Sequence, residues 1–396
     1  MRKIPPVIDV EGMPVLNLNH IELLTDDTGI IQHARYALPH YPEGYCTDDN
    51  ARALAFAVSS DAVYPSKLGS INKELIGTYA AFMNAAFNPE TRQFRNFMSY
   101  DRQWLDDGGS DDCQGRSLYA LGATILNTSD SDLRQWAAVM FQTAVTSILT
   151  TSSPRAWAQA LLGIDAYLSA LAGDRNVQRV GDQLEERLIS LFRNVQSEGW
   201  HWFENELTYD NAILPQALIA RGAKNPETLE IGVNTLKWLV AQQSARAGHF
   251  RPIGSSGFYP RDGERAMFDQ QPIEAAGKVS ACLAAYKATE DNYWLMQARI
   301  AFAWFHGRND IGTSIYDPQS GGCRDGLCLD RVNMNQGAES TLAYLSARLQ
   351  MDVVEKRQVP IIQKTNGLAR TALPTIAKNG SLPNSGVVFS GSEIAT

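Results

Sequence analysis

Long apolar runs and basic patches are both missing from this 396-residue sequence. No stretch reaches the roughly 18 consecutive apolar residues that a membrane-spanning helix needs. The N-terminus, MRKIPPVIDVEGMPVLNL, lacks the apolar segment of a signal peptide. Acidic residues outnumber basic ones, 43 to 35, and no basic stripe is visible, which argues against a nucleic-acid partner. We therefore expect a cytoplasmic protein with neither a membrane nor a nucleic acid as partner.

Metal-binding and cofactor motifs are also missing. The five cysteines are scattered, and the one close pair, in CRDGLC, has no second pair to complete a zinc site. The six histidines form no HxH or HExxH pattern. There is no Walker motif and no GxGxxG after a strand. The sequence predicts no metal and no cofactor, and the cysteines are expected to be free thiols.

Helical periodicity dominates from about residue 47 to residue 350. Runs such as ELIGTYAAFMNAAF and AWAQALLGIDAYLSALAG carry apolar residues at steps of three and four. Alternation of the kind that strands show is rare and short. The fold class predicted is therefore all-α.

The predicted helices are of two kinds. Six begin with a polar motif and continue with small and apolar residues; their starts are TDDNARALAF, SDDCQGRSLYALG, SPRAWAQALLGI, TYDNAILPQALIA, FDQQPIEAAGKVSACLAAY and NQGAESTLAYLSA. Between them lie more charged helices, at about residues 70–87, 131–150, 175–196, 226–243 and 291–307. Small residues let inner helices approach closely, and charged helices suit an outer layer. This predicts an (α/α)6 toroid.

The outer ring is short by one helix, which either residues 17–36 or the stretch after residue 350 could supply. We expect the toroid to comprise residues 1–352, with residues 1–40 as an N-terminal lead-in. Residues 353–396 are rich in Pro, Gly, Ser and Thr, which predicts a C-terminal tail that is extended or partly disordered.

The six polar starts are expected to meet at one end of the toroid. Helix N-termini expose unpaired N–H groups that suit hydroxyl-rich ligands. Capping needs one Ser, Thr, Asp or Asn, so the motifs carry more polar groups than caps require. In each Asp-Asp pair we expect one acid to cap its helix, with Asp48 as the cap beside Asp49, and the other to face the ligand. Asp49, Asp112 and Asp210 are the catalytic candidates.

Loops before these helices combine aromatic rings with acids, amides and guanidinium groups, the mixture that sugar sites use. The arginines of the inner helices leave another role open for two acids: Glu274 and Glu339 could pair with Arg52, Arg116 or Arg155 instead of binding sugar. The predicted substrate-binding residues are Asp48, Asp111, Arg116, Trp104, Trp202, Glu204, Asn211, Arg251, Tyr259, Asp269, Gln270, Glu274, Gln336 and Glu339.

Several long motifs resemble a bacterial family of six-hairpin-glycosidase-like proteins, over roughly residues 16–350. They include EGYCTDDNARAL, FRNFMSYDRQWLDDGGSDDCQGR, TYDNAILPQAL, FRPIGSSGFYPRDGERAMFDQQPIEA and NQGAESTLAYL. Members occur alone or fused behind a glycosyltransferase domain. The resemblance implies an (α/α)6 toroid, a carbohydrate context and a functional link to a glycosyltransferase.

We predict a glycoside hydrolase acting on an oligosaccharide. Glycoside hydrolysis needs one carboxyl group as acid and one as base, and the helix starts contain more carboxyl groups than capping requires. Three alternatives stay open. A phosphorylase could use the arginines around residues 251–265 to bind phosphate. A sugar epimerase could use His201 and His249. A non-catalytic module could bind glycans for a glycosyltransferase partner.

Overall fold

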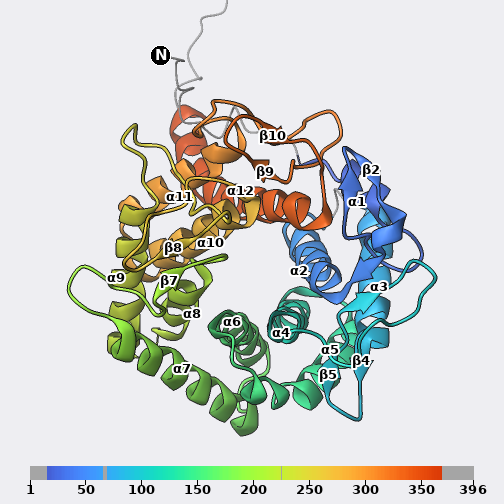
Figure 1. Ribbon diagram of the computed structural model, residues 1–396. Helices are drawn as coiled ribbons and strands as arrows, with labels where there is room; N and C mark the ends of the chain where they lie inside the picture. The colour runs from blue at the N-terminus through green and yellow to red at the C-terminus, as the bar shows by residue number, and fades with distance from the viewer. Residues whose placement is uncertain (1–15, 66–68, 224, 368–396) are drawn as a thin grey trace, which may run out of the picture. The chain divides into compact units, whose positions relative to one another are not determined.

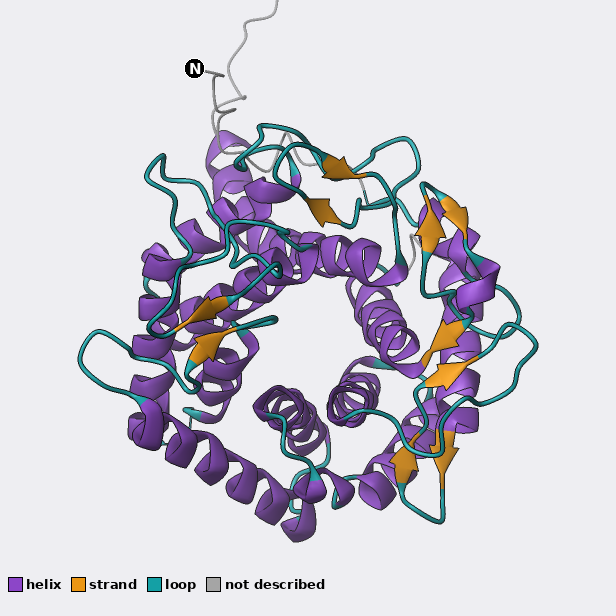
Figure 2. Cartoon of the chain, in the orientation of Figure 1, coloured by secondary structure: helices purple, strands orange, loops and turns teal. Residues whose placement is uncertain are grey.

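The computed structural model describes residues 16–65, 69–223 and 225–367. The chain divides into two compact units, Met1–Val354 and Glu355–Thr396, and the first of them contains the rings of helices. Figures 1 and 2 show two concentric rings, as the sequence predicts. The inner ring consists of α2 (Thr47–Val63), α4 (Asp111–Asn127), α6 (Pro154–Ala170), α8 (Ile213–Arg221), α10 (Pro272–Thr289) and the beginning of α12 (Ala338–Gly367).

The outer ring alternates with the inner one along the chain. It consists of α3 (Gly69–Ala86), α5 (Ser131–Ala144), α7 (Arg175–Val195), α9 (Pro226–Gln242) and α11 (Asn292–Phe305). The described residues supply no sixth long outer helix: the segment 17–36 forms only the six-residue α1 (Asn19–Leu24). The prediction of an extended tail from residue 353 is wrong as far as Gly367, because α12 continues to that residue; residues 368–396 lie outside the described part.

Local signals start the helices where the sequence predicts them. Ser110 and Ser153 accept hydrogen bonds from backbone N–H groups of α4 and α6, and Asp174 does the same for α7. Proline at the first position of α6, α9 and α10 already has a helical φ. The cap of α2 is Cys46, whose Sγ accepts from the N–H of Asp49. The prediction that Asp48 caps this helix is therefore wrong.

The inner helices approach closely where glycine faces glycine. A Cβ added to Gly122 of α4 would lie 2.3 Å from the carbonyl oxygen of Gly163 on α6, and one added to Gly115 would lie 2.7 Å from Cα of Ala156. The packing confirms that small residues set the spacing of the inner ring.

Short strands and turns make up the loops, and five antiparallel two-stranded ribbons organise them within residues 16–65, 69–223 and 225–367. They pair β1 (Ala34–Arg35) with β2 (Leu38–Pro39), β3 (Tyr45–Cys46) with β6 (Phe97–Met98), β4 (Phe87–Asn88) with β5 (Gln93–Phe94), β7 (Glu206–Leu207) with β8 (Tyr259–Pro260), and β9 (Gly326–Leu327) with β10 (Val332–Asn333). Two 3-10 helices, η2 (Tyr41–Glu43) and η3 (Ser147–Thr150), complete the loops of the described part of the chain. Among the described residues, no helix has both the length and the apolar character needed to cross a membrane.

Candidate functional site

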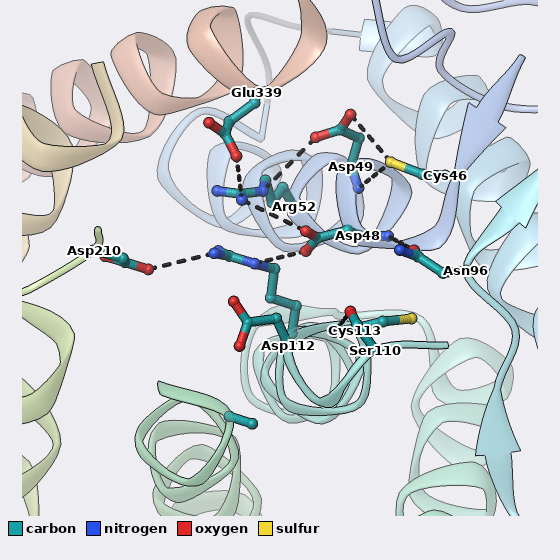
Figure 3. A network of polar contacts seen from close by, with 12 residues as sticks. Cys46, Asp48, Asp49, Arg52, Asn96, Ser110, Asp112, Cys113, Asp210 and Glu339 are labelled. Atoms are coloured by element: carbon teal, nitrogen blue, oxygen red, sulfur yellow. Dashed lines mark hydrogen bonds and ion pairs between the residues drawn. The ribbon is translucent and has the colours of Figure 1, made fainter. Parts of the chain in front are cut away.

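The starts of the inner helices meet, as predicted, at one end of the ring, which we call the mouth. Contacts across it join residues far apart in the sequence. Arg52 of α2 donates to Glu339 of α12 at 2.6 Å. Asp48 Oδ1 of α2 lies 2.6 Å from Nε of Arg116 on α4, and the same guanidinium reaches Asp210, before α8, at 3.4 Å. Figure 3 shows Asp48, Arg52, Asp210 and Glu339 in one network of polar contacts at the mouth.

Arg116 holds two carboxylates from opposite sides of the ring. The two contact distances and the width of one guanidinium group keep the contacting oxygens of Asp48 and Asp210 closer than about 9.5 Å, the upper limit for paired carboxyl groups in glycosidases. The pair Arg52–Glu339 confirms one alternative left open by the sequence, in which Glu339 partners an inner-helix arginine.

Asp210 is a buried acid at the mouth with a strained backbone. The residue is 5% exposed, and its backbone has a φ of 44°, a left-handed conformation that costs energy for a residue other than glycine. Burial raises the pKa of Asp210, while Arg116 opposes that rise and the charge of Asp112 adds to it. A buried carboxyl group that retains its proton can act as a general acid.

Asp112 lies in a more polar setting. It is half-buried, and its two oxygens accept hydrogen bonds from Ser153 Oγ at 3.0 Å and from the Tyr209 hydroxyl at 2.7 Å. No ion pair to Asp112 occurs within the described residues. Asp111 turns the other way and accepts from the backbone N–H groups of Ser152 and Ser153. Asp111 thereby stabilises the start of α6. It is not needed as a cap for its own helix, because Ser110 caps α4.

Asp49 and Glu274 are buried acids with high proton affinity. Burial raises the pKa of Asp49 to about 7, although Arg52 acts in the opposite direction. The thiol of Cys46 donates to Asp49 Oδ2 at 3.2 Å. Burial also raises the pKa of Glu274 to about 7, against the hydrogen bonds from Asn211. Glu274 accepts from the backbone N–H and side-chain amide of Asn211 and from Gln243, so its role is to hold the turn that carries Asp210.

Arg155 organises the turn on the other side of Asp210. Its guanidinium binds both oxygens of Glu204, at 2.9 and 3.2 Å, and donates to Thr208 Oγ1 at 2.6 Å. The same group lies 4.6 Å from the ring centre of Tyr209. Sequence reasoning included Glu204 but missed Tyr209, the residue that connects Arg155 to Asp112. The sequence signal that could have identified Tyr209 is its position directly before the catalytic candidate Asp210.

A second polar cluster lies in the loops around α10 and α11. Asp310 accepts from Gln270 at 2.6 Å, from His249 at 2.9 Å and from Arg251. Burial raises the pKa of Asp310, but these hydrogen bonds outweigh it and leave the pKa below its usual range. Gln270 is fully buried and also accepts from Trp304 at 3.0 Å. The sequence analysis named Gln270 and Arg251 but missed Asp310, the residue that joins them.

The remaining predicted residues lie apart from Asp210. Trp202 is fully buried and stacks on Trp238 of the outer helix α9, so the structure corrects its assignment: it offers no face to a sugar. Trp104 packs half-buried on Phe82 of α3. Ser320 and Asp317 hold Gln336, Tyr259 packs on Trp200, and Asp269 is exposed.

A cavity that is partly open to solvent, which we call the axial chamber, lies among the inner helices next to the mouth. It has a volume of about 200 Å³. Arg52, Arg116 and Asp210 line it at the mouth side, whereas Asp48, Asp112 and Glu339 do not. Every inner helix contributes to its wall. One wall residue from each of these helices, in chain order, is Phe56, Tyr119, Gln159, Gln216, Ile273 and Leu342. Within the described residues, no group of three or more His, Cys, Asp or Glu is arranged to hold a metal ion.

Comparison with protein-family models and with curated proteins finds no match for this sequence. Solved structures do match. Cellobiose 2-epimerase from Bacillus thermoamylovorans has a TM-score of 0.65 at 13% identity, over 86% of this chain and 96% of that one. A D-mannose isomerase has a TM-score of 0.62 at 13% identity, over 85% and 95%.

A GH76 α-mannanase from Bacteroides thetaiotaomicron has a TM-score of 0.60 at 11% identity, over 87% of this chain and 95% of that one. At these identities the match concerns the fold. It confirms the (α/α)6 toroid that the sequence motifs predict. The chain therefore shares its (α/α)6 fold with these three enzymes.

Proposed function

We propose that this protein is a carbohydrate-active enzyme that hydrolyses a glycosidic bond in an oligosaccharide at the mouth of the ring. The observation that carries the proposal is the contrast between Asp210 and Asp112. Burial raises the pKa of Asp210, whereas Asp112 is half-buried and accepts from two hydroxyl groups. Neighbouring carboxyl groups in environments that differ in this way divide the roles of acid and base.

Asp210 is the general acid in this mechanism. Its proton passes to the glycosidic oxygen as the bond between that oxygen and the anomeric carbon breaks. Asp112 is the general base: it takes a proton from the water that attacks the anomeric carbon. Tyr209 and Ser153 orient the Asp112 carboxylate through their hydroxyl groups, and Arg116 holds Asp210 in place. Asp49, the third candidate from the sequence, contacts Cys46 and Arg52 and supports the position of Arg52.

Histidine chemistry, the basis of the epimerase alternative, has less support. His249 is committed to Asp310, and His20 bonds to the backbone oxygen of Gln336. His306 lies among Phe302, Tyr316 and Tyr344. Of the chain's six histidines, all of which lie in the described part, none lines the axial chamber.

A glycan panel tests the proposal. Mannose- and glucose-containing oligosaccharides are incubated with the wild type, Asp210→Asn, Asp112→Asn and the control Asp107→Asn, whose side chain is exposed. We expect turnover to fall by at least about 10²-fold in the first two variants, the usual minimum for loss of a general acid or base. Oligosaccharide binding should persist, and the control should match the wild type.

Other products would overturn the proposal. Epimerised sugars without hydrolysis would indicate isomerase chemistry, and release of sugar phosphates only when phosphate is added would indicate a phosphorylase. Binding across the panel with no turnover would instead indicate a non-catalytic glycan-binding role.

A further inference from the structure

The axial chamber contains polar groups that the protein itself leaves unpaired. Gln159 of α6 is 3% exposed and lines the chamber, and neither its amide nitrogen nor its amide oxygen has a partner within the described residues. Gln216 of α8, also in the wall, has an unpaired side-chain oxygen. Buried amides without partners are destabilising, so a ligand or ordered water is needed to satisfy them.

The chemistry of the wall defines the ligand. Phe56 and Tyr119 supply aromatic surface, and aromatic rings pack on the C–H faces of a sugar. The unpaired amide atoms of Gln159 and Gln216 supply a donor and acceptors for hydroxyl groups. The combination of apolar surface with a few placed polar groups is typical of small-molecule sites.

The charges at the chamber are already balanced. Arg52 pairs with Glu339, and Arg116 pairs with both Asp48 and Asp210. These are the charged residues of the wall within the described part, and all three, Arg52, Arg116 and Asp210, lie at the mouth side. The chamber is therefore suited to a neutral ligand. Its volume of about 200 Å³ is below the roughly 300–1,000 Å³ of pockets for drug-sized molecules, and it suits the part of a ligand that is one sugar ring in size.

We propose that the axial chamber binds the terminal sugar ring of the substrate, so that the enzyme removes single neutral sugars from a chain end. This inference rests on the proposed hydrolysis, because Asp210 lies at the boundary between chamber and mouth. A ring in the chamber places its glycosidic bond beside Asp210. The rest of the oligosaccharide extends into the mouth, where Asp112 lies.

Binding of free sugars tests the chamber without requiring turnover. Calorimetry with D-glucose, D-mannose and N-acetyl-D-glucosamine compares the wild type with Gln159→Leu and Gln216→Leu. The control is Gln178→Leu, at an exposed position of the outer helix α7. We expect the wild type to bind at least one sugar at millimolar concentration, Gln159→Leu to bind it at least 10-fold more weakly, and the control to be unchanged. Melting curves verify that each variant is folded, and Gln216→Leu gives a second measurement if Gln159→Leu is not.

Equal binding by the wild type and both chamber variants would overturn the inference, because the chamber would then hold only water. Absence of sugar binding by the wild type would overturn it as well. A second measurement monitors the products from an end-labelled oligosaccharide. Stepwise shortening by one sugar is expected. Internal cleavage would overturn the chamber assignment while leaving the hydrolase proposal intact. Sugar binding in the chamber without hydrolysis would overturn the hydrolase proposal, and with it the removal of single sugars, but would leave the chamber as a sugar-binding site.

Discussion

Gly277 of α10 lies directly against Asp210: a Cβ added to the glycine would stand 3.0 Å from Oδ1 of the aspartate. Glycine therefore leaves the space that the Asp210 carboxyl group occupies. Because Asp210 also contacts Arg116, its carboxyl group is held between an arginine on α4 and the backbone of α10 at Gly277, which has no side chain.

Replacing Gly277 by alanine should displace the Asp210 carboxyl group. A small displacement of a reacting group can lower a rate by about 10²-fold, so kcat should fall by about 10- to 100-fold with little change in KM. The measurement is steady-state kinetics on the substrate found in the glycan panel. Gly77→Ala is the matched control, since no atom lies within 4 Å of its added Cβ. Unchanged kcat in Gly277→Ala would show that the position of Asp210 does not limit the reaction.

The helices could be predicted because their signals are local. The polar motifs place the starts of the six inner helices within a few residues of the observed ones, with α8 beginning later, at Ile213. The pairing of side chains could not be predicted in the same way. Asp48 pairs with Arg116, and Arg116 with Asp210, residues separated by whole hairpins. Their distances depend on ring closure, which no local pattern contains.

Aromatic residues show the same limit. Trp202 and Tyr209 lie in one loop and both suit a sugar site by composition, yet Trp202 stacks on Trp238 in the core while Tyr209 donates to Asp112. Whether a ring is buried in the core or reaches the acids of the mouth depends on the packing against α9. The capping role expected of Asp48 belongs to Cys46, which fills it through its sulfur, and cysteine is not among the usual capping residues.

Asp49 should make stability depend on pH. Burial raises its folded-state pKa to about 7, from an unfolded value near 4. Its stabilising contribution is then full below about pH 4 and is lost as pH rises through about 7, because the buried group must give up its proton. The free energy of unfolding should fall over this window by a few kcal/mol, at about 1.4 kcal/mol per unit of pKa.

Urea titrations of the wild type and Asp49→Asn between pH 4 and 8 measure this effect. Asparagine stays neutral, so the variant should lose less stability than the wild type as the pH rises. Asp107→Asn serves as the exposed control. Parallel pH profiles for the wild type and Asp49→Asn would show that Arg52 keeps Asp49 ionised throughout.

Arg221 should be essential for stability but not for chemistry. At the end of α8 it contacts Asp182 at 2.6 Å, Glu185 at 2.9 Å and Asp165 at 3.1 Å, and it is 8% exposed. Arg221→Leu leaves these acids without their shared cation, which should cost about 3–5 kcal/mol. Thermal and urea unfolding measure the loss. Arg193→Leu, which removes an exposed pair with Glu227, should cost less than about 1 kcal/mol; equal losses in both variants would contradict the buried role of Arg221.

Gly122 and Gly163 should be intolerant of any side chain. A Cβ on Gly122 would lie 2.3 Å from the Gly163 carbonyl oxygen, a backbone atom that moves only if α4 and α6 separate. Gly122→Ala should therefore destabilise the protein by about 1–3 kcal/mol, the usual cost of overpacking. Gly77→Ala, in the outer helix α3 with open space around it, should instead stabilise by up to about 1 kcal/mol through helix propensity. Urea unfolding of both variants decides the matter: a stabilised Gly122→Ala would mean that the inner ring can widen at little cost.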